Sequence, residues 1–268
     1  MEPGSFVPPM LAVTADAPFS RSGWWFETKW DGYRAILSIG REFRAYSRNG
    51  HDLQAWYPAI RRAREVLPDD VVLDAELVAW VDGRPQFSRL QQRTADQYLL
   101  MVFDGLYADG RWLMQEPLYR RQAVLRQRVR STGMVVLCDG LEEQGEALFS
   151  TIAEAGLEGV MAKRMDSPYL PGRRSVTWQK FLAYHADWFR VYAVSRAEDG
   201  AWYWHIGDDG DGRLRSVGKV HAPRGWRPDG GIEDPFLAQV QYRERTREGH
   251  LRHARLREWR PNHTNSPS

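Results

Sequence analysis

Short apolar runs separated by turn-forming residues fill the first two thirds of the chain. The runs WWFETKW, YRAILSIG and FRAYSR are bounded by Asp-Gly and Arg-Asn-Gly sequences, which are typical of tight turns between antiparallel strands. Two further runs, VVLDAELVAW and YLLMVFDGLY, have the length and the β-branched or aromatic content of strands. The pattern predicts antiparallel sheets, with a hairpin at each turn.

Two segments carry apolar residues at helical spacing and have arginine-rich outer faces. They are WYPAIRRAREVL and PLYRRQAVLRQRVR. Helices packed on antiparallel sheets define an α+β domain, which we expect to cover residues 1–183.

After residue 183 the pattern contains short strands and no helical spacing. The runs RVYAVSR, AWYWHIG, RLRSVGKV and LAQVQYRERT are separated by Gly, Asp and Pro. Several short strands in a small domain predict an all-β barrel over residues 184–262, for which the oligonucleotide-binding (OB) fold is the natural candidate. The polar tail, residues 263–268, is predicted to be disordered.

Composition narrows the class of protein. The 268 residues carry a net charge of +2, which excludes a histone-like polycation but permits a local phosphate-binding face. The single Cys138 excludes an intramolecular disulfide, and no Cys/His spacing indicates zinc. There is no N-terminal leader pattern and no apolar run of membrane-spanning length, so we expect a cytoplasmic protein without a membrane partner.

Lysine is rare in this chain and therefore informative. Lys29, Lys163, Lys180 and Lys219 are its only lysines among 37 basic residues. Arginine is always protonated, whereas a lysine amine can lose its proton and attack an electrophile. Lys29 stands at the end of a strand-like run, just before Asp31 and Gly32. It is a candidate nucleophile, and the alternative is a solvated lysine beside a structural hairpin.

Six segments in order resemble a known family. KWDGYR, SRNG, LDAELV, MVFDGLY, EGVMAKR and TWQKF are similar to the motifs of covalent nucleotidyltransferases, and within them of ATP-dependent DNA ligases. The segment LEGVMAKRMDSPYLPGRRS most resembles the ligase module of bacterial end-joining ligase D and its stand-alone relatives. The resemblance implies a nucleotidyltransferase (adenylation) domain of antiparallel sheets with flanking helices, followed by the OB-fold domain.

The resemblance also implies the reaction. Lys29 would attack the α-phosphate of ATP, AMP would pass to the 5′-phosphate at a DNA nick, and a 3′-hydroxyl would displace AMP. A divalent metal, Mg²⁺ or Mn²⁺, would assist because negative charge develops at phosphorus in every step. The implied partner is nicked double-stranded DNA, together with a possible repair or end-joining protein. A nucleoid-associated monomer is expected.

Residue roles follow from the same resemblance. Glu27 would face the adenine edge and Phe103 would stack on the base, although Phe103 on an apolar strand also fits a core position. Arg34 and Glu76 would hold the ribose and its metal-linked surroundings, and Arg48 would meet the nick phosphate. The expected catalytic residues are Lys29, Asp31, Lys163 and Lys180; the nucleotide contacts are Glu27, Thr28, Lys29, Arg34, Arg48, Glu76, Phe103, Lys163, Lys180, Arg257 and Arg260; the metal ligands are Glu76 and Glu158.

The chain departs from the family pattern at three positions. Leu182 stands where relatives commonly carry a second lysine after Lys180, and Asn262 and His263 replace an acid and a lysine of the terminal motif. Arg257 and Arg260 of that motif would orient pyrophosphate, or alternatively contact the DNA backbone. Two other functions stay open: an RNA ligase or capping-type guanylyltransferase of the same fold, and a catalytically weakened DNA-binding accessory protein.

Overall fold

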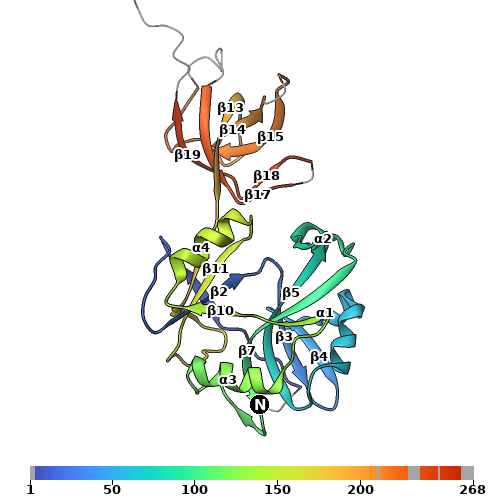
Figure 1. The fold of residues 1–268 in the computed structure, drawn as a ribbon. Helices are drawn as coiled ribbons and strands as arrows, with labels where there is room; N and C mark the ends of the chain where they lie inside the picture. Colours follow the sequence, from blue (N-terminus) through green and yellow to red (C-terminus); the bar gives the residue numbers. More distant parts are fainter. Residues whose placement is uncertain (1–3, 210–211, 229–235, 247, 261–268) are drawn as a thin grey trace, which may run out of the picture. The chain divides into compact units, whose positions relative to one another are not determined.

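The computed structural model describes residues 4–209, 212–228, 236–246 and 248–260. The chain divides into two compact units, Met1–Ala183 and Tyr184–Ser268, and each has its own apolar core (Figure 1). Within the described ranges, none of the helices combines the length and the hydrophobicity that a bilayer-spanning segment needs.

A seven-stranded sheet forms the centre of the first unit. Its spatial order is β4-β3-β5-β7-β8, with β6 paired to β5 and β9 paired to β7. The strands are β3 (Tyr33–Ile39), β4 (Phe43–Ser47), β5 (Val71–Val81), β6 (Arg84–Pro85), β7 (Gln97–Ala108), β8 (Arg111–Trp112) and β9 (Val135–Leu137). Because successive residues of a strand face opposite sides, β3 and β5 supply two separate apolar clusters. The two long strands and the antiparallel pairing of β3 with β4 are as predicted.

A second, five-stranded sheet lies in the same unit, in the order β1-β12-β11-β2-β10. Its strands are β1 (Leu11–Thr14), β2 (Trp24–Lys29), β10 (Gly140–Glu142), β11 (Gly159–Arg164) and β12 (Arg174–Leu182). Strand β2 is antiparallel to both of its neighbours, and β1 runs parallel to β12. The sheet therefore joins segments from both ends of this unit.

The hairpin predicted at Asp31-Gly32 is wrong. Strand β2 pairs with β10 and β11, whereas β3 pairs with β4 and β5, so the chain crosses from one sheet to the other between Lys29 and Tyr33. Glycine is needed because a Cβ at Gly32 would lie 2.2 Å from the carbonyl oxygen of Leu77 on β5. The dipeptide thus reflects close packing of the turn against another strand, which local sequence does not distinguish from a hairpin loop.

Helices are few and short. They are α1 (Leu53–Trp56), the 3₁₀ helix η1 (Pro58–Glu65), α2 (Phe87–Gln92), α3 (Leu118–Arg128) and α4 (Gly145–Glu154). The prediction of α3 is confirmed, and α2 and α4 were not predicted. The other predicted helix is largely the 3₁₀ helix η1, which begins at Pro58 and buries Ile60 and Ala63, three residues apart on one face.

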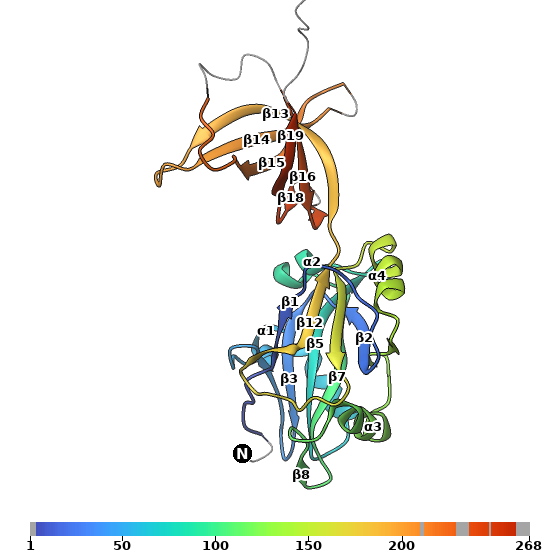
Figure 2. The ribbon, with the colours of Figure 1, turned by 90° about the vertical axis from the view of Figure 1, so that its left-hand side faces the viewer.

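The second unit consists of strands and turns in its described part. Its main sheet has the antiparallel order β15-β14-β13-β16-β19 and is strongly curved (Figure 2). The strands are β13 (His185–Arg196), β14 (Trp202–Asp208), β15 (Arg215–His221), β16 (Phe236–Tyr242) and β19 (Arg255–Arg260), and β17 (Glu244–Arg245) with β18 (Leu251–Arg252) forms a small hairpin. Trp204 is fully buried at the centre and packs edge-on against the rings of Trp226, Phe236 and Trp259.

Candidate active site

A cleft of about 230 Å³ in the first unit is lined by residues from both sheets. The five-stranded sheet contributes side chains from β1, β2, β11 and β12, and the seven-stranded sheet contributes side chains from β3, β5 and β7. The lining residues are Leu11, Ala12, Glu27, Thr28, Lys29, Trp30, Arg34, Arg48, Glu76, Phe103, Met161, Lys163, Arg174, Trp178 and Lys180. Most residues that the sequence analysis singled out in this unit therefore meet in one cavity.

Lys29 stands at the end of β2 and forms an ion pair in this cleft. Its Nζ lies 2.6 Å from Oε2 of Glu158, and the two side chains are 20% and 5% exposed. Glu158 comes directly before β11, whose first residue, Gly159, pairs in register with Lys29. A Cβ at Gly159 would lie 2.0 Å from the carbonyl oxygen of Phe181, so only glycine allows β11 to start here. The glycine after Glu158 thus allows the start of β11 to place the Glu158 carboxylate next to the Lys29 amine.

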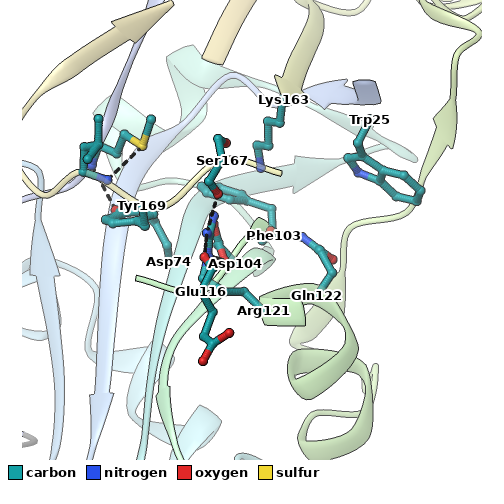
Figure 3. Close-up of polar contacts among 12 residues, drawn as sticks. Trp25, Asp74, Phe103, Asp104, Glu116, Arg121, Gln122, Lys163, Ser167 and Tyr169 are labelled. Atoms are coloured by element: carbon teal, nitrogen blue, oxygen red, sulfur yellow. Dashed lines mark hydrogen bonds and ion pairs between the residues drawn. The ribbon is translucent and has the colours of Figure 1, made fainter. Parts of the chain in front are cut away.

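A buried ion pair between Glu27 and Lys163 occupies the same cleft. Both side chains are almost completely buried, and the Glu27 carboxylate also accepts a hydrogen bond from Trp25. The Lys163 Nζ lies 4.3 Å from the ring centre of Phe103 (Figure 3). It also lies 4.5 Å from the ring centre of Trp178. Burial raises the pKa of Glu27, although the charge of Lys163 opposes the shift. Both residues were expected to contact the nucleotide, and here they contact each other.

Arg34 is held by a carboxylate that the sequence analysis missed. Its guanidinium makes two hydrogen bonds to Asp74, of 2.5 and 2.6 Å, and Asp74 also accepts one of 2.6 Å from the Tyr169 hydroxyl. Burial alone would lower the pKa of Arg34, but the charge and hydrogen bonds of Asp74 raise it. Asp74 lies two residues before Glu76 on the same apolar strand, and this acid inside an apolar run was the available signal.

Glu76 lies opposite Arg34 in the pairing of β3 with β5. Burial raises its pKa to about 7, Lys29 and Arg34 act against this shift, and the negative charge of Glu158 adds to it. Glu76 and Glu158, the two predicted metal ligands, are therefore close enough to influence each other electrostatically. No cluster of three or more His, Cys, Asp or Glu side chains suited to a metal ion occurs in the described part of the chain.

The remaining predicted residues lie at several places. Arg48 is exposed in the turn after β4 and lines the cleft, as does Lys180 on β12. Asp31 lies in the turn between the sheets. Missed lining residues include Met161, Arg174 and Trp178; Trp178 belongs to the TWQKF segment itself, so its signal was present in the sequence.

Arg257 and Arg260 lie on β19 of the second unit. The Arg260 guanidinium lies 4.5 Å over the Trp188 ring and 3.4 Å from a carboxylate oxygen of Glu258. Asn262, His263 and the predicted disordered tail lie outside the described residues.

Fold and cleft together define a nucleotidyltransferase-type ligase, built mainly of sheets with few helices. A solved structure titled as a mycobacterial DNA ligase D complexed with ATP and MES superimposes with a TM-score of 0.65 and 31% identity, covering 96% of this chain and 95% of that one. The chain belongs to the ATP-dependent DNA ligase family, because the family described as "ATP dependent DNA ligase domain" matches residues 9–181. The resemblance noted in the sequence is confirmed.

Two curated relatives differ in how much of their own length the chain covers. It is 33% identical over 292 residues to the multifunctional non-homologous end joining DNA repair protein LigD of Mycobacterium tuberculosis, covering 94% of this chain but only 38% of that protein. It is 28% identical over 272 residues to the SPbeta prophage-derived DNA ligase-like protein LigB of Bacillus subtilis, covering 95% of this chain and 99% of that one.

Proposed function

We propose that this protein is an ATP-dependent DNA ligase that seals nicks carrying a 5′-phosphate and a 3′-hydroxyl. One observation carries the proposal: the amine of Lys29 lies in a cleft that combines cations with the apolar rings of Phe103 and Trp178. Phosphates are stabilised by cations, and a purine base packs on aromatic rings. The family membership and the ATP complex of the mycobacterial relative support ATP as the nucleotide.

Lys29 is the nucleophile in this proposal. Its amine forms a bond to the α-phosphorus of ATP while the bond to pyrophosphate breaks, which leaves AMP on the lysine. An oxygen of the 5′-phosphate at the nick then attacks the phosphorus of the AMP, and the bond to Lys29 breaks. Finally the 3′-hydroxyl loses its proton and attacks the 5′-phosphate, which closes the strand and releases AMP. Only a neutral amine attacks, so Lys29 must first give up its proton and its ion pair with Glu158.

The other cleft residues serve binding and charge stabilisation. We assign Glu27, Thr28 and Phe103 to the adenosine, and Arg34 with Glu76 to the ribose and its surroundings. Negative charge grows around one phosphorus in each step, so Lys163 and Lys180 stabilise phosphates and Arg48 binds the nick phosphate. Asp31 shapes the turn that presents Lys29.

A divalent cation, Mg²⁺ or Mn²⁺, fits beside Glu76 and Glu158. The observation behind this fit is that the negative charge of Glu158 adds to the rise in the pKa of Glu76 that burial causes, so the two carboxylates are near each other, and a hard cation prefers carboxylate oxygen. Two carboxylates do not surround an ion, but Mg²⁺ in nucleotide enzymes commonly takes its remaining ligands from phosphate and water. When bound, the ion would supply positive charge next to the reacting phosphate.

We assign the second unit, up to residue 262, to the OB fold and the first to the adenylation domain. The curved antiparallel sheet around Trp204 supports the OB assignment. Arg257 and Arg260 would orient pyrophosphate during the first step. Nicked duplex DNA is the proposed substrate, bound by a nucleoid-associated monomer in the cytoplasm, alone or with a repair or end-joining protein.

Incubation of the purified protein with labelled ATP or GTP tests the function. A covalent AMP adduct that survives denaturation, followed by sealing of nicked DNA, is the expected result. A GTP adduct would favour a capping-type guanylyltransferase, and better sealing of nicked RNA would favour an RNA ligase. Nicked-DNA binding without any adduct would identify an accessory protein.

A further inference from the structure

Strand β7 carries a β-bulge at Phe103, which lies on the same face of the sheet as Leu99 and Met101. Across the pairing with β5, Ala75 lies opposite Val102 and Asp74 lies opposite Asp104, so Phe103 is an extra residue without a partner. A bulge interrupts the alternation of side chains, which allows two consecutive residues to face one side of the sheet. Phe103 lines the cleft, and the bulge places the next residue, Asp104, on the same face, where it binds Arg121 beside Tyr169.

Helix α3 holds this bulge at two consecutive positions (Figure 3). The Gln122 amide donates a 2.5 Å hydrogen bond to the carbonyl oxygen of Phe103. The Arg121 guanidinium makes two 2.8 Å hydrogen bonds to Asp104, and both of these side chains are fully buried. Strand β9 does not reach the bulge, because its last residue, Leu137, pairs with Val102.

The hydrogen bond to the Phe103 carbonyl oxygen is the one that the structure gives for the Gln122 side chain within the described residues. Only 8% of the residue is exposed, and its Oε1 is buried without a hydrogen-bond partner among the described residues. A buried carbonyl that loses its donor is costly, so removal of the Gln122 amide should shift the bulged backbone toward another partner. The ring of Phe103 is attached to that backbone and would tilt with it.

We propose that Gln122 is a positioning residue for the adenine base, acting through the Phe103 bulge. The inference rests on the proposed function, in which Phe103 stacks on the base. Stacking requires the two ring faces to align, so a backbone that holds Phe103 in one direction strengthens nucleotide binding. Gln122 itself does not line the cleft.

The test compares two Gln→Met variants, each of which removes one hydrogen bond from a side-chain amide to a backbone carbonyl oxygen. Gln122→Met keeps the volume and removes the buried donor to Phe103. Gln97→Met, at the start of β7, removes an exposed 2.8 Å bond to the carbonyl oxygen of Gly133. The probe is α,β-methylene ATP, which cannot transfer AMP, titrated calorimetrically. We expect Gln122→Met to weaken the Kd about five- to tenfold, the effect of one net hydrogen bond, and Gln97→Met to leave it within about twofold.

A double-mutant cycle separates positioning from general destabilisation. In a Phe103→Leu background, Gln122→Met should change the Kd less than about twofold, because the ring through which it acts is gone. Full additivity, or an unchanged Kd for Gln122→Met alone, overturns the inference while leaving the ligase assignment intact. If Gln122→Met fails to fold, Gln122→Asn, which retracts the amide by one methylene, carries the same expectations.

The proposed function fails separately from this inference. A parent protein that forms no AMP adduct overturns the ligase assignment. A Phe103→Leu protein that binds the probe like the parent overturns the stacking role of Phe103, and with it the role of Gln122, even if adducts form normally.

Discussion

The side-chain nitrogen of Lys29 lies 2.6 Å from Oε2 of Glu158, and adjacent strands bring the two together. The ion pair holds the lysine side chain in the cleft. The proposed role of Lys29 requires a side chain that can both form the pair and act as a neutral nucleophile. Lysine satisfies both conditions, and arginine satisfies only the first.

Lys29→Arg should form no AMP adduct and should remain folded, because a guanidinium can still pair with Glu158. Intact-protein mass spectrometry after incubation with ATP and a divalent metal measures the adduct, and thermal unfolding reports the fold. Lys219→Arg, which keeps a cation over the Tyr203 ring in the second unit, is the matched control and should become adenylated. Covalent AMP on the Lys29→Arg protein would show that another residue is the nucleophile.

Glu76 should make the stability of the protein depend on pH. Its pKa in the folded state is about 7, raised by burial from an ordinary value of 4.5, so the folded state binds this proton more tightly than the unfolded chain does. The resulting stabilisation is fully present below about pH 4.5 and is lost as pH rises to about 7 and beyond. The shift corresponds to about 3 kcal/mol at most.

Glu76→Gln removes this titration. Relative to the parent, we expect the variant to gain stability as pH rises, by about 1–3 kcal/mol between about pH 5 and pH 8 in urea unfolding. Glu42→Gln makes the same chemical change at an exposed ion pair with Arg44 and should leave the parent's pH profile nearly unchanged. Parallel profiles for the parent and Glu76→Gln would contradict a raised pKa at Glu76.

Asp74 and Tyr169 should differ sharply in their effect on stability. Asp74→Asn leaves the largely buried Arg34 without its counter-charge and should cost about 3–5 kcal/mol of the free energy of unfolding. Tyr169→Phe removes a hydroxyl that accepts from the Met10 amide and donates to Asp74, and should cost about 1–3 kcal/mol.

Tyr46→Phe is the control for these two variants. It removes one hydroxyl bonded to the carbonyl oxygen of Gly4, so we expect a loss of about 1 kcal/mol. Urea unfolding at one pH ranks all three variants. An Asp74→Asn protein no less stable than Tyr46→Phe would mean that Arg34 finds another partner or reaches water.

Local periodicity predicted the long strands and α3, and the ordered motifs predicted which residues gather in the cleft. Local periodicity failed where segments distant in the sequence determine the structure. Gly32 marks a crossing between sheets because of Leu77, and the partner of Arg34 is Asp74 because β3 pairs with β5 in one register. The bulge at Phe103 likewise depends on β5 and α3, so no window of sequence around residue 103 contains it.

The two arginines of β19 support two different roles. Both side chains are exposed, and Arg260 also packs on Trp188 and lies near Glu258. Two guanidinium groups are well suited to pyrophosphate, which they bind through charge-assisted hydrogen bonds. They are equally suited to the phosphates of a DNA backbone. The roles differ in which step of ligation they affect.

If Arg257 and Arg260 orient pyrophosphate, changing both to Ala should slow formation of the Lys29 adenylate at least tenfold and spare sealing of a nick that already carries AMP. Single-turnover assays of each step measure this, and the loss of the Arg260–Trp188 contact should cost only about 0.5–1 kcal/mol of stability. Arg255→Ala, at an exposed position of the same strand, is the control and should leave adenylation at the parent rate. A backbone role gives the opposite result: normal adenylation, weaker binding of nicked DNA and a shallower salt dependence, because fewer phosphates are neutralised. Adenylation of the double variant at the parent rate would assign both arginines to DNA.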